Sequence, residues 1–148
     1  MQRLLHRFFI LKAGMESFHF GDEITEKNWH TGYTVKKRKG CFAMLFNKET
    51  FENLVNNGEK PVLVEFQAPW CGYCRRLASA METVEKQYES QLSIGFVDID
   101  QEPELEEQEK IELIPTLVLY HKGKRLGTVV NPESKAKIDA FIRETLEK

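Results

Sequence analysis

Hydrophobic residues follow two patterns along residues 42–148, and the two patterns alternate. Short apolar runs bounded by polar residues are typical of buried strands. Apolar residues three and four positions apart, such as Leu77, Met81 and Val84, are typical of one face of a helix. The patterns predict strands at 42–46, 61–66, 92–99, 116–120 and 125–130, and helices at 47–57, at 71–88, from 103 onward and over 138–146.

The order of these elements predicts the fold class. Strands and helices alternate up to residue 116, which favours parallel strands joined by helices. The last two predicted strands flank Lys122 and Gly123, and this spacing is typical of a β-hairpin with an antiparallel edge. Asn47 is a candidate N-cap for the first helix. We therefore expect an α/β domain over residues 41–148, with a central mixed sheet flanked by helices.

The charge balance changes near residue 40. Residues 1–40 contain eight Lys and Arg and four Asp and Glu (+4), whereas residues 41–148 contain thirteen and nineteen (−6), which together give the net charge of −2. We interpret residues 1–40 as a basic N-terminal extension that ends in the charged stretch 36–40, which predicts a solvated linker. Because the chain as a whole is slightly acidic, we expect no binding of nucleic acid.

The first thirteen residues contain three basic and no acidic residues. A secretory signal needs about 7–15 uninterrupted apolar residues, whereas His6 and Arg7 interrupt the stretch here. We therefore expect no secretory signal and a cytoplasmic protein; an organellar transit peptide or a translation start at Met15 is the alternative. No apolar run approaches the roughly 18 residues of a membrane-spanning helix, so we expect no integral membrane segment.

The chain contains three cysteines, Cys41, Cys71 and Cys74, too few for a disulfide-stapled scaffold or an all-cysteine zinc site. Cys71 and Cys74 lie at the start of the predicted helix 71–88. A helix N-terminus stabilises an anion and therefore favours a thiolate, the species that attacks a disulfide. We expect Cys71 to be the nucleophile and Cys74, one turn later, to resolve the mixed disulfide. The histidines show no ligand spacing, so we expect no metal.

Several ordered motifs accompany the cysteine pair. They are residues 64–74 (VEFQAPWCGYC), residues 97–100 (VDID), the Ile114-Pro115-Thr116 motif and the turn at Gly123. Together these motifs resemble the thioredoxin family over residues 42–147. The resemblance implies a thioredoxin fold, thiol–disulfide oxidoreductase activity and no bound cofactor.

The resemblance also implies roles for residues around the cysteines. It implies that Pro115 follows a cis peptide bond and leaves the backbone of Ile114 to bind an extended substrate segment. It sets Glu65 at the position of a buried acid that exchanges protons with Cys74, and burial suits a carboxyl group to this role by disfavouring its charged form. A structural glutamate is the alternative. The candidate catalytic residues are Cys71, Cys74 and Glu65, and the candidate substrate-binding residues are Trp70, Gly72, Tyr73, Ile114 and Pro115.

The sequence departs from reducing thioredoxins at four positions. Gln67 stands where a tryptophan is common, and Ser79 stands where a helix proline is usual. Tyr73 stands where a proline is usual, and Asn131 stands where a glycine is usual. Losing the proline removes a rigid element at the helix start. We therefore expect a reduction potential less negative than the roughly −270 mV of thioredoxin.

We expect an enzyme that reduces protein disulfides by dithiol–disulfide exchange. It would act as a monomer on disulfide-containing proteins, with a dithiol or a flavoprotein reductase as its electron donor. Two alternatives stay open: an exported disulfide oxidase or isomerase, and a non-catalytic module that binds partners beside Pro115.

Overall fold

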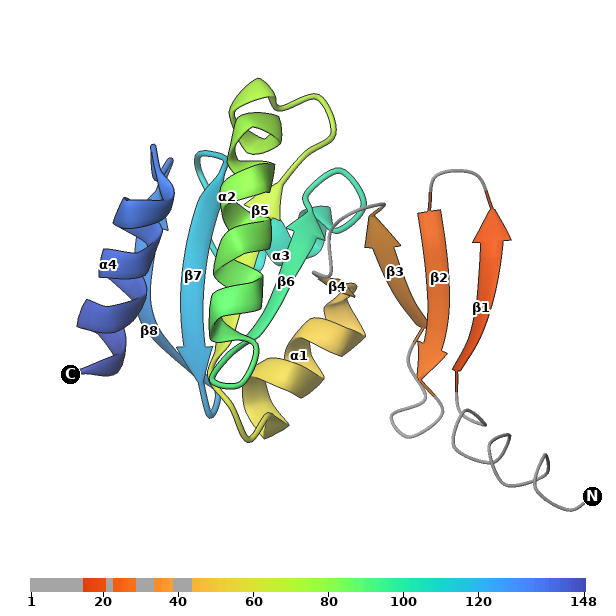
Figure 1. Ribbon diagram of the computed structural model, residues 1–148, viewed down its shortest axis with the longest axis horizontal. Coiled ribbons are helices and arrows are strands. Elements are labelled where there is room, and N and C mark those ends of the chain that lie inside the picture. The colour runs from red at the N-terminus through yellow and green to blue at the C-terminus, as the bar shows by residue number, and fades with distance from the viewer. Residues whose placement is uncertain (1–14, 21–22, 29–33, 39–43) are drawn as a thin grey trace, which may run out of the picture. The chain divides into compact units, whose positions relative to one another are not determined.

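The computed structural model describes residues 15–20, 23–28, 34–38 and 44–148 (Figure 1). These residues belong to two compact units, one up to residue 39 and one from residue 40. Cys41 lies outside the described residues, as do residues 1–14.

The first unit contains three antiparallel strands: β1 (Met15–Phe20), β2 (Glu23–Asn28) and β3 (Thr34–Arg38). The predicted linker at 36–40 is wrong for residues 36–38, which belong to β3, and its residues 39 and 40 lie outside the described residues. A strand forms through main-chain pairing, and a run of like charges does not prevent it. The register sets Arg38 opposite Glu23 along the two strands.

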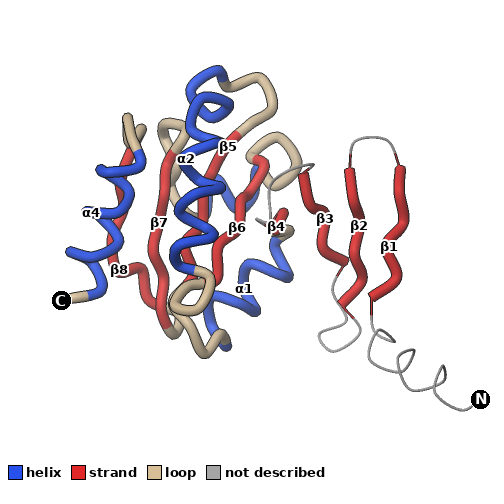
Figure 2. The backbone as a smooth tube through the Cα atoms, in the orientation of Figure 1, coloured by secondary structure: helices blue, strands red, loops and turns tan. Residues whose placement is uncertain are grey.

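The second unit contains a mixed sheet with helices packed against it, which confirms the predicted fold class. Figure 2 shows its strands in red and its helices in blue. Its strands follow the spatial order β4, β6, β5, β7, β8. The first three of these run parallel, and β7 and β8 continue the sheet with antiparallel pairings. The strands are β4 (Met44–Leu45), β5 (Val62–Gln67), β6 (Ser93–Asp98), β7 (Thr116–His121) and β8 (Lys124–Val130).

The helices of the second unit lie where the apolar stripes predict them. They are α1 (Lys48–Asn57), α2 (Gly72–Tyr88), α3 (Pro103–Gln108) and α4 (Lys135–Leu146). Asn47 is confirmed as the N-cap of α1, because its side chain accepts a hydrogen bond from the Thr50 N–H at 2.8 Å. The predicted hairpin is also confirmed: Lys122 and Gly123 turn between β7 and β8 with φ angles of 49° and 75°.

Two apolar clusters cover the two faces of this sheet. On one face, Val64 and Phe66 of β5 pack with residues of α1 and α3. On the other face, Leu63 packs with residues of α2 and α4, and α2 lies in front of β5 in Figure 1. All residues of β5 are buried, as expected for a strand covered on both faces. None of the helices among the described residues is long and apolar enough to span a bilayer.

The sheet topology brings two distant segments to one edge. Strand β5 ends at Gln67, shortly before α2 begins. Its neighbour β7 begins at Thr116, which pairs with Phe66. The start of α2 and the segment before β7 therefore meet at the carboxyl end of β5, the end of parallel strands where α/β proteins build their sites.

Candidate active site

The cysteine pair lies at the start of α2. Cys71 is the N-cap of the helix and forms a disulfide with Cys74, with the two Cα atoms 5.3 Å apart. The Cys74 N–H donates to the Cys71 Sγ over 3.1 Å, and the Cys71 N–H donates to the Ala68 carbonyl, also over 3.1 Å. The sulfur of Cys71 thus occupies the position that a capping oxygen occupies in other helices. This position favours negative charge on the sulfur once the disulfide is reduced.

Both cysteines are nearly buried: Cys71 is 5% exposed and Cys74 is 2% exposed. They belong to the apolar cluster on the α1 and α3 face of the sheet, together with Phe66. The surrounding apolar side chains exclude water from the pair and fix its geometry. A disulfide of this kind can accept two electrons and become a dithiol.

The aromatic residues beside the pair are exposed. Trp70 is 64% exposed, and its indole N–H donates to the Asp100 carboxylate over 3.0 Å. Tyr73 is 59% exposed, and the Arg76 guanidinium carbon lies 4.3 Å from the centre of its ring, a cation–π contact. Gly72 between them is also exposed. These side chains form a surface around the cysteines that a second protein can reach.

The segment before β7 forms the other border of the site. The Ile114–Pro115 peptide bond is cis, as expected from the family resemblance. Ile114 packs against the apolar cluster that contains both cysteines. The Pro115 carbonyl accepts a hydrogen bond from the Asn131 N–H over 2.8 Å, which ties this segment to the residues after β8. Leu113, immediately upstream, is 65% exposed and adds an apolar side chain to this border.

Glu65 is buried in the middle of β5, with 6% of its surface exposed. Strand alternation sets it on the same face as Leu63, the face that α2 covers. The first turn of α2 carries Cys74. A proton-transfer role for Glu65 stays a prediction.

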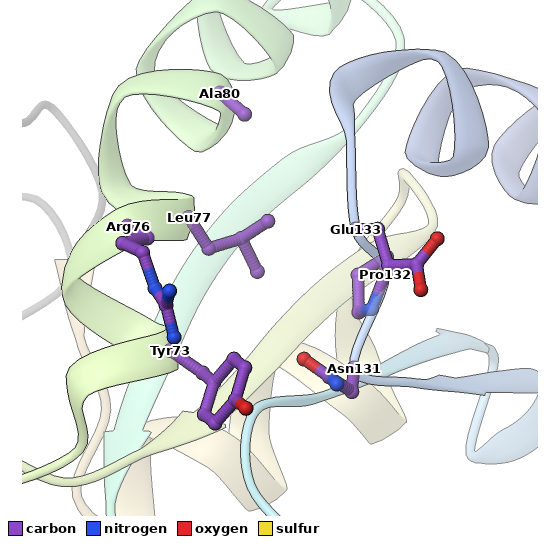
Figure 3. A pocket seen from close by; sticks show the side chains of 7 residues that line it. All are labelled: Tyr73, Arg76, Leu77, Ala80, Asn131, Pro132 and Glu133. Carbon is purple, nitrogen blue, oxygen red and sulfur yellow. The ribbon is translucent and has the colours of Figure 1, made fainter.

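A pocket of about 390 Å³ lies against the N-terminal half of α2, the helix whose start carries the cysteine pair (Figure 3). One wall comes from α2 and the other from the segment between β8 and α4. The lining residues are Tyr73, Arg76, Leu77, Ala80, Asn131, Pro132 and Glu133. In Figure 3 the Tyr73 hydroxyl and the Asn131 side chain lie toward one another, with Arg76 on the helix side and Glu133 on the opposite side. The pocket therefore carries both charged and aromatic groups.

Three features of the site were missed by the sequence analysis: the Asp100 bond to Trp70, the Arg76 contact with Tyr73, and the exposure of Leu113. A signal existed for Leu113, which is an apolar residue immediately before the Ile-Pro-Thr motif. None existed for Asp100, which is thirty residues from Trp70. Among the residues that the structure describes, no group of three or more metal-ligating side chains comes together.

Comparison with known proteins gives consistent matches. The family model named Thioredoxin matches residues 42–144. A thioredoxin of Acidithiobacillus ferridurans is 39% identical over 105 residues, covering 70% of this chain and 97% of that protein. Thioredoxin 1 of a Nostoc species is 36% identical over 99 residues, covering 67% of this chain and 89% of that protein. A bifunctional thioredoxin reductase/thioredoxin of Mycobacterium leprae is 30% identical over 115 residues, covering 78% of this chain and 25% of that protein.

Proposed function

Because the chain belongs to the thioredoxin family and is a thiol–disulfide oxidoreductase, we propose that it works as a reductase of protein disulfides. One observation carries the proposal: the nearly buried Cys71 sulfur caps α2 and accepts the Cys74 N–H. This arrangement supports an attacking thiolate with a second thiol one turn away.

The proposed reaction proceeds in two exchanges. The Cys71 thiolate attacks one sulfur of a substrate disulfide, the substrate S–S bond breaks, and the other substrate sulfur leaves as a thiolate that takes up a proton. Cys74 then loses its proton and attacks the Cys71 sulfur, which releases the second substrate thiol. Two electrons have passed to the substrate, and the Cys71–Cys74 disulfide has formed. We assign Glu65 the role of accepting the Cys74 proton, supported by its burial in the strand that α2 covers.

The substrate is proposed to bind over the surface around the pair. The exposure of Trp70, Gly72 and Tyr73 supports contact with a second protein. The backbone of Ile114, beside the cis Pro115, is proposed to pair with an extended substrate segment. A dithiol or a flavoprotein reductase would restore the dithiol form. The name of the Mycobacterium leprae relative, which joins a thioredoxin reductase to a thioredoxin, supports a reductase as the donor.

The proposal is tested by insulin reduction with dithiothreitol as the electron source. We expect turnover by the wild-type chain and none by Cys71→Ser. Cys74→Ser should instead accumulate a mixed disulfide with insulin, visible by mass spectrometry and absent in Cys71→Ser. The matched control is Cys41→Ser, which should retain full turnover. Failure of the wild-type chain to reduce insulin would favour the binding module, which needs neither thiol.

The role of Glu65 has its own readout, the rate at which the mixed disulfide resolves. General acid–base groups contribute typically 10²–10⁴-fold, so Glu65→Gln should slow resolution by roughly a hundredfold or more while the first attack stays fast. Glu65→Asp should restore part of the rate, because it keeps the carboxyl group. If both exchanges slow equally, the glutamate is structural.

The direction of electron flow is tested by equilibration with a glutathione buffer. We expect a reduction potential between two known values: less negative than the roughly −270 mV of thioredoxin, and clearly more negative than the roughly −120 mV of strongly oxidising thiol–disulfide enzymes. A reduction potential near about −120 mV would favour the exported oxidase or isomerase. We propose the cytoplasm as the compartment, because a reducing environment maintains the dithiol form that a reductase needs.

A further inference from the structure

We propose that the pocket beside the redox pair is a substrate subsite that selects an acidic side chain through Arg76. The inference rests on the proposed reductase function and adds a substrate class to it. The preferred disulfides would be those with an aspartate or glutamate within about two residues of the attacked cysteine.

The position of the pocket supports this role, because both of its walls belong to elements that frame the cysteines. Tyr73 stands between Cys71 and Cys74 in the first turn of α2 and lines one wall. Asn131 lines the other wall, and its backbone N–H donates a hydrogen bond to the Pro115 carbonyl. A substrate bound through its cysteine would therefore extend neighbouring side chains into this space.

Arg76 supplies the positive charge of the pocket. Its guanidinium lies over the Tyr73 ring, 4.3 Å from the ring centre, and this contact fixes the group at the pocket wall. Stacking uses the face of a guanidinium, whereas its N–H donors lie in the plane and stay available. No ion pair with Arg76 occurs among the described residues, so its charge is not offset by a carboxylate of that part of the chain.

The negative charge that lines the pocket belongs to Glu133, and it is paired with a lysine outside the lining. Glu133 lies on the opposite side of the pocket, and its carboxylate accepts a hydrogen bond from the Lys137 ammonium over 2.9 Å. This contact keeps the pKa of Glu133 below its ordinary value, so the pair is ionised and has no net charge. Arg76 is left as the uncompensated charge, with the Asn131 amide as a second donor. A carboxylate is the complementary group, since a guanidinium binds it through two parallel hydrogen bonds.

The experiment measures the preference between competing peptides. Disulfide-closed peptides that differ only by Glu, Gln or Lys at one position near the attacked cysteine are mixed, and reduction is followed by mass spectrometry under dithiothreitol. The ratio of consumption rates gives the ratio of kcat/KM. We expect the Glu peptide to be preferred to the Gln peptide by roughly two- to fivefold in at least one position, the range for a partly exposed ion pair. The preference should weaken in high salt.

Substitutions then assign the preference to one residue. Arg76→Gln should bring the Glu/Gln ratio to about one, and Arg76→Glu should favour the Lys peptide. The matched control is Arg75→Gln, which removes an equal charge from the neighbouring residue. Arg75 donates to the Pro69 carbonyl and is not among the residues that line the pocket, so this variant should keep the preference.

Two results would overturn the inference while leaving the proposed function intact: turnover of all peptides without any charge preference, or equal loss of preference in Arg75→Gln and Arg76→Gln. The second result would mean that the general positive field of the helix start, and not the pocket, attracts acidic substrates. Absence of peptide and insulin turnover in the wild-type chain would instead contradict the reductase function itself.

Discussion

Replacing Gly95 with alanine should destabilise the second unit strongly, because Phe46 occupies the space that a side chain at residue 95 needs. Gly95 lies in β6, between Met44 of β4 and Val64 of β5. A Cβ atom built there would lie 2.2, 2.5 and 2.6 Å from three atoms of the Phe46 ring. These distances are far below van der Waals contact, so the ring or the strand must move.

The size of the effect follows from the packing of that ring. To reach a contact of 3.4 Å from 2.2 Å, the ring must retreat by about 1.2 Å, the difference between the two distances. Phe46 is 0% exposed, and a close-packed interior has few voids to receive it. Overpacking costs typically 1–3 kcal/mol, and we expect a loss of about 3 kcal/mol in the free energy of unfolding. For a domain near 100 residues this corresponds to a fall of roughly 12 °C or more in Tm.

Thermal and urea unfolding followed by circular dichroism measure the loss. Gly72→Ala is the matched control, because a Cβ there meets only the Arg75 side chain at 3.9 Å and should leave Tm unchanged or slightly higher. Phe46→Leu combined with Gly95→Ala should be less destabilising than the sum of the two single changes by about 1 kcal/mol or more. A Tm within about 3 °C of the wild type for Gly95→Ala, or strictly additive losses, would refute the steric argument.

Three smaller predictions follow from single contacts. Burial, with the hydrogen bond to Glu109, raises the pKa of Tyr120 above its ordinary value, so its stabilising contribution is present below about pH 10 and is lost as the pH rises further. Tyr120→Phe should therefore reduce the fall in unfolding free energy between about pH 9 and about pH 11.5, measured by urea titration at each pH. A fall as steep as that of the wild type would contradict this. Asn47→Ala should cost about 1 kcal/mol of unfolding free energy, whereas Asn47→Asp should retain the cap. Asp100→Ala should lower kcat/KM for insulin roughly threefold by releasing the Trp70 indole, with Asp100→Asn intermediate.

Local signals were sufficient for most of the second unit. The helix stripe of Leu77, Met81 and Val84 predicted the buried face of α2, because a helix repeats every 3.6 residues and only one face meets the sheet. Asn47 predicted the start of α1 because an N-cap acts on residues two or three positions away. The pairing of Cys71 with Cys74 was equally local. In each case the residues that make up the signal lie within a few helical turns of one another, so the local sequence contains it.

Features that depend on contacts between distant residues could not be predicted from local sequence patterns. The cis bond before Pro115 was expected only from the family resemblance, since the pattern of apolar residues contains no sign of it. The pocket joins residues 73–80 of α2 to Asn131, more than fifty residues later, and its existence depends on how helix and sheet pack. The strand at 34–38 was missed for a related reason. It forms by pairing with another strand, and its run of charged residues lacks the alternation of apolar and polar residues by which a strand is predicted.

The depth at which the redox sulfurs lie restricts which disulfides this chain can open. With Cys71 only 5% exposed, a rigid and flat surface cannot bring its own sulfur into line with the attacking atom. The target must protrude, or its loop must detach from its own fold for the duration of the exchange. The rate of exchange therefore depends on the free-energy cost of opening the target protein locally. The same disulfide becomes a better substrate in a partly unfolded protein than in a native one.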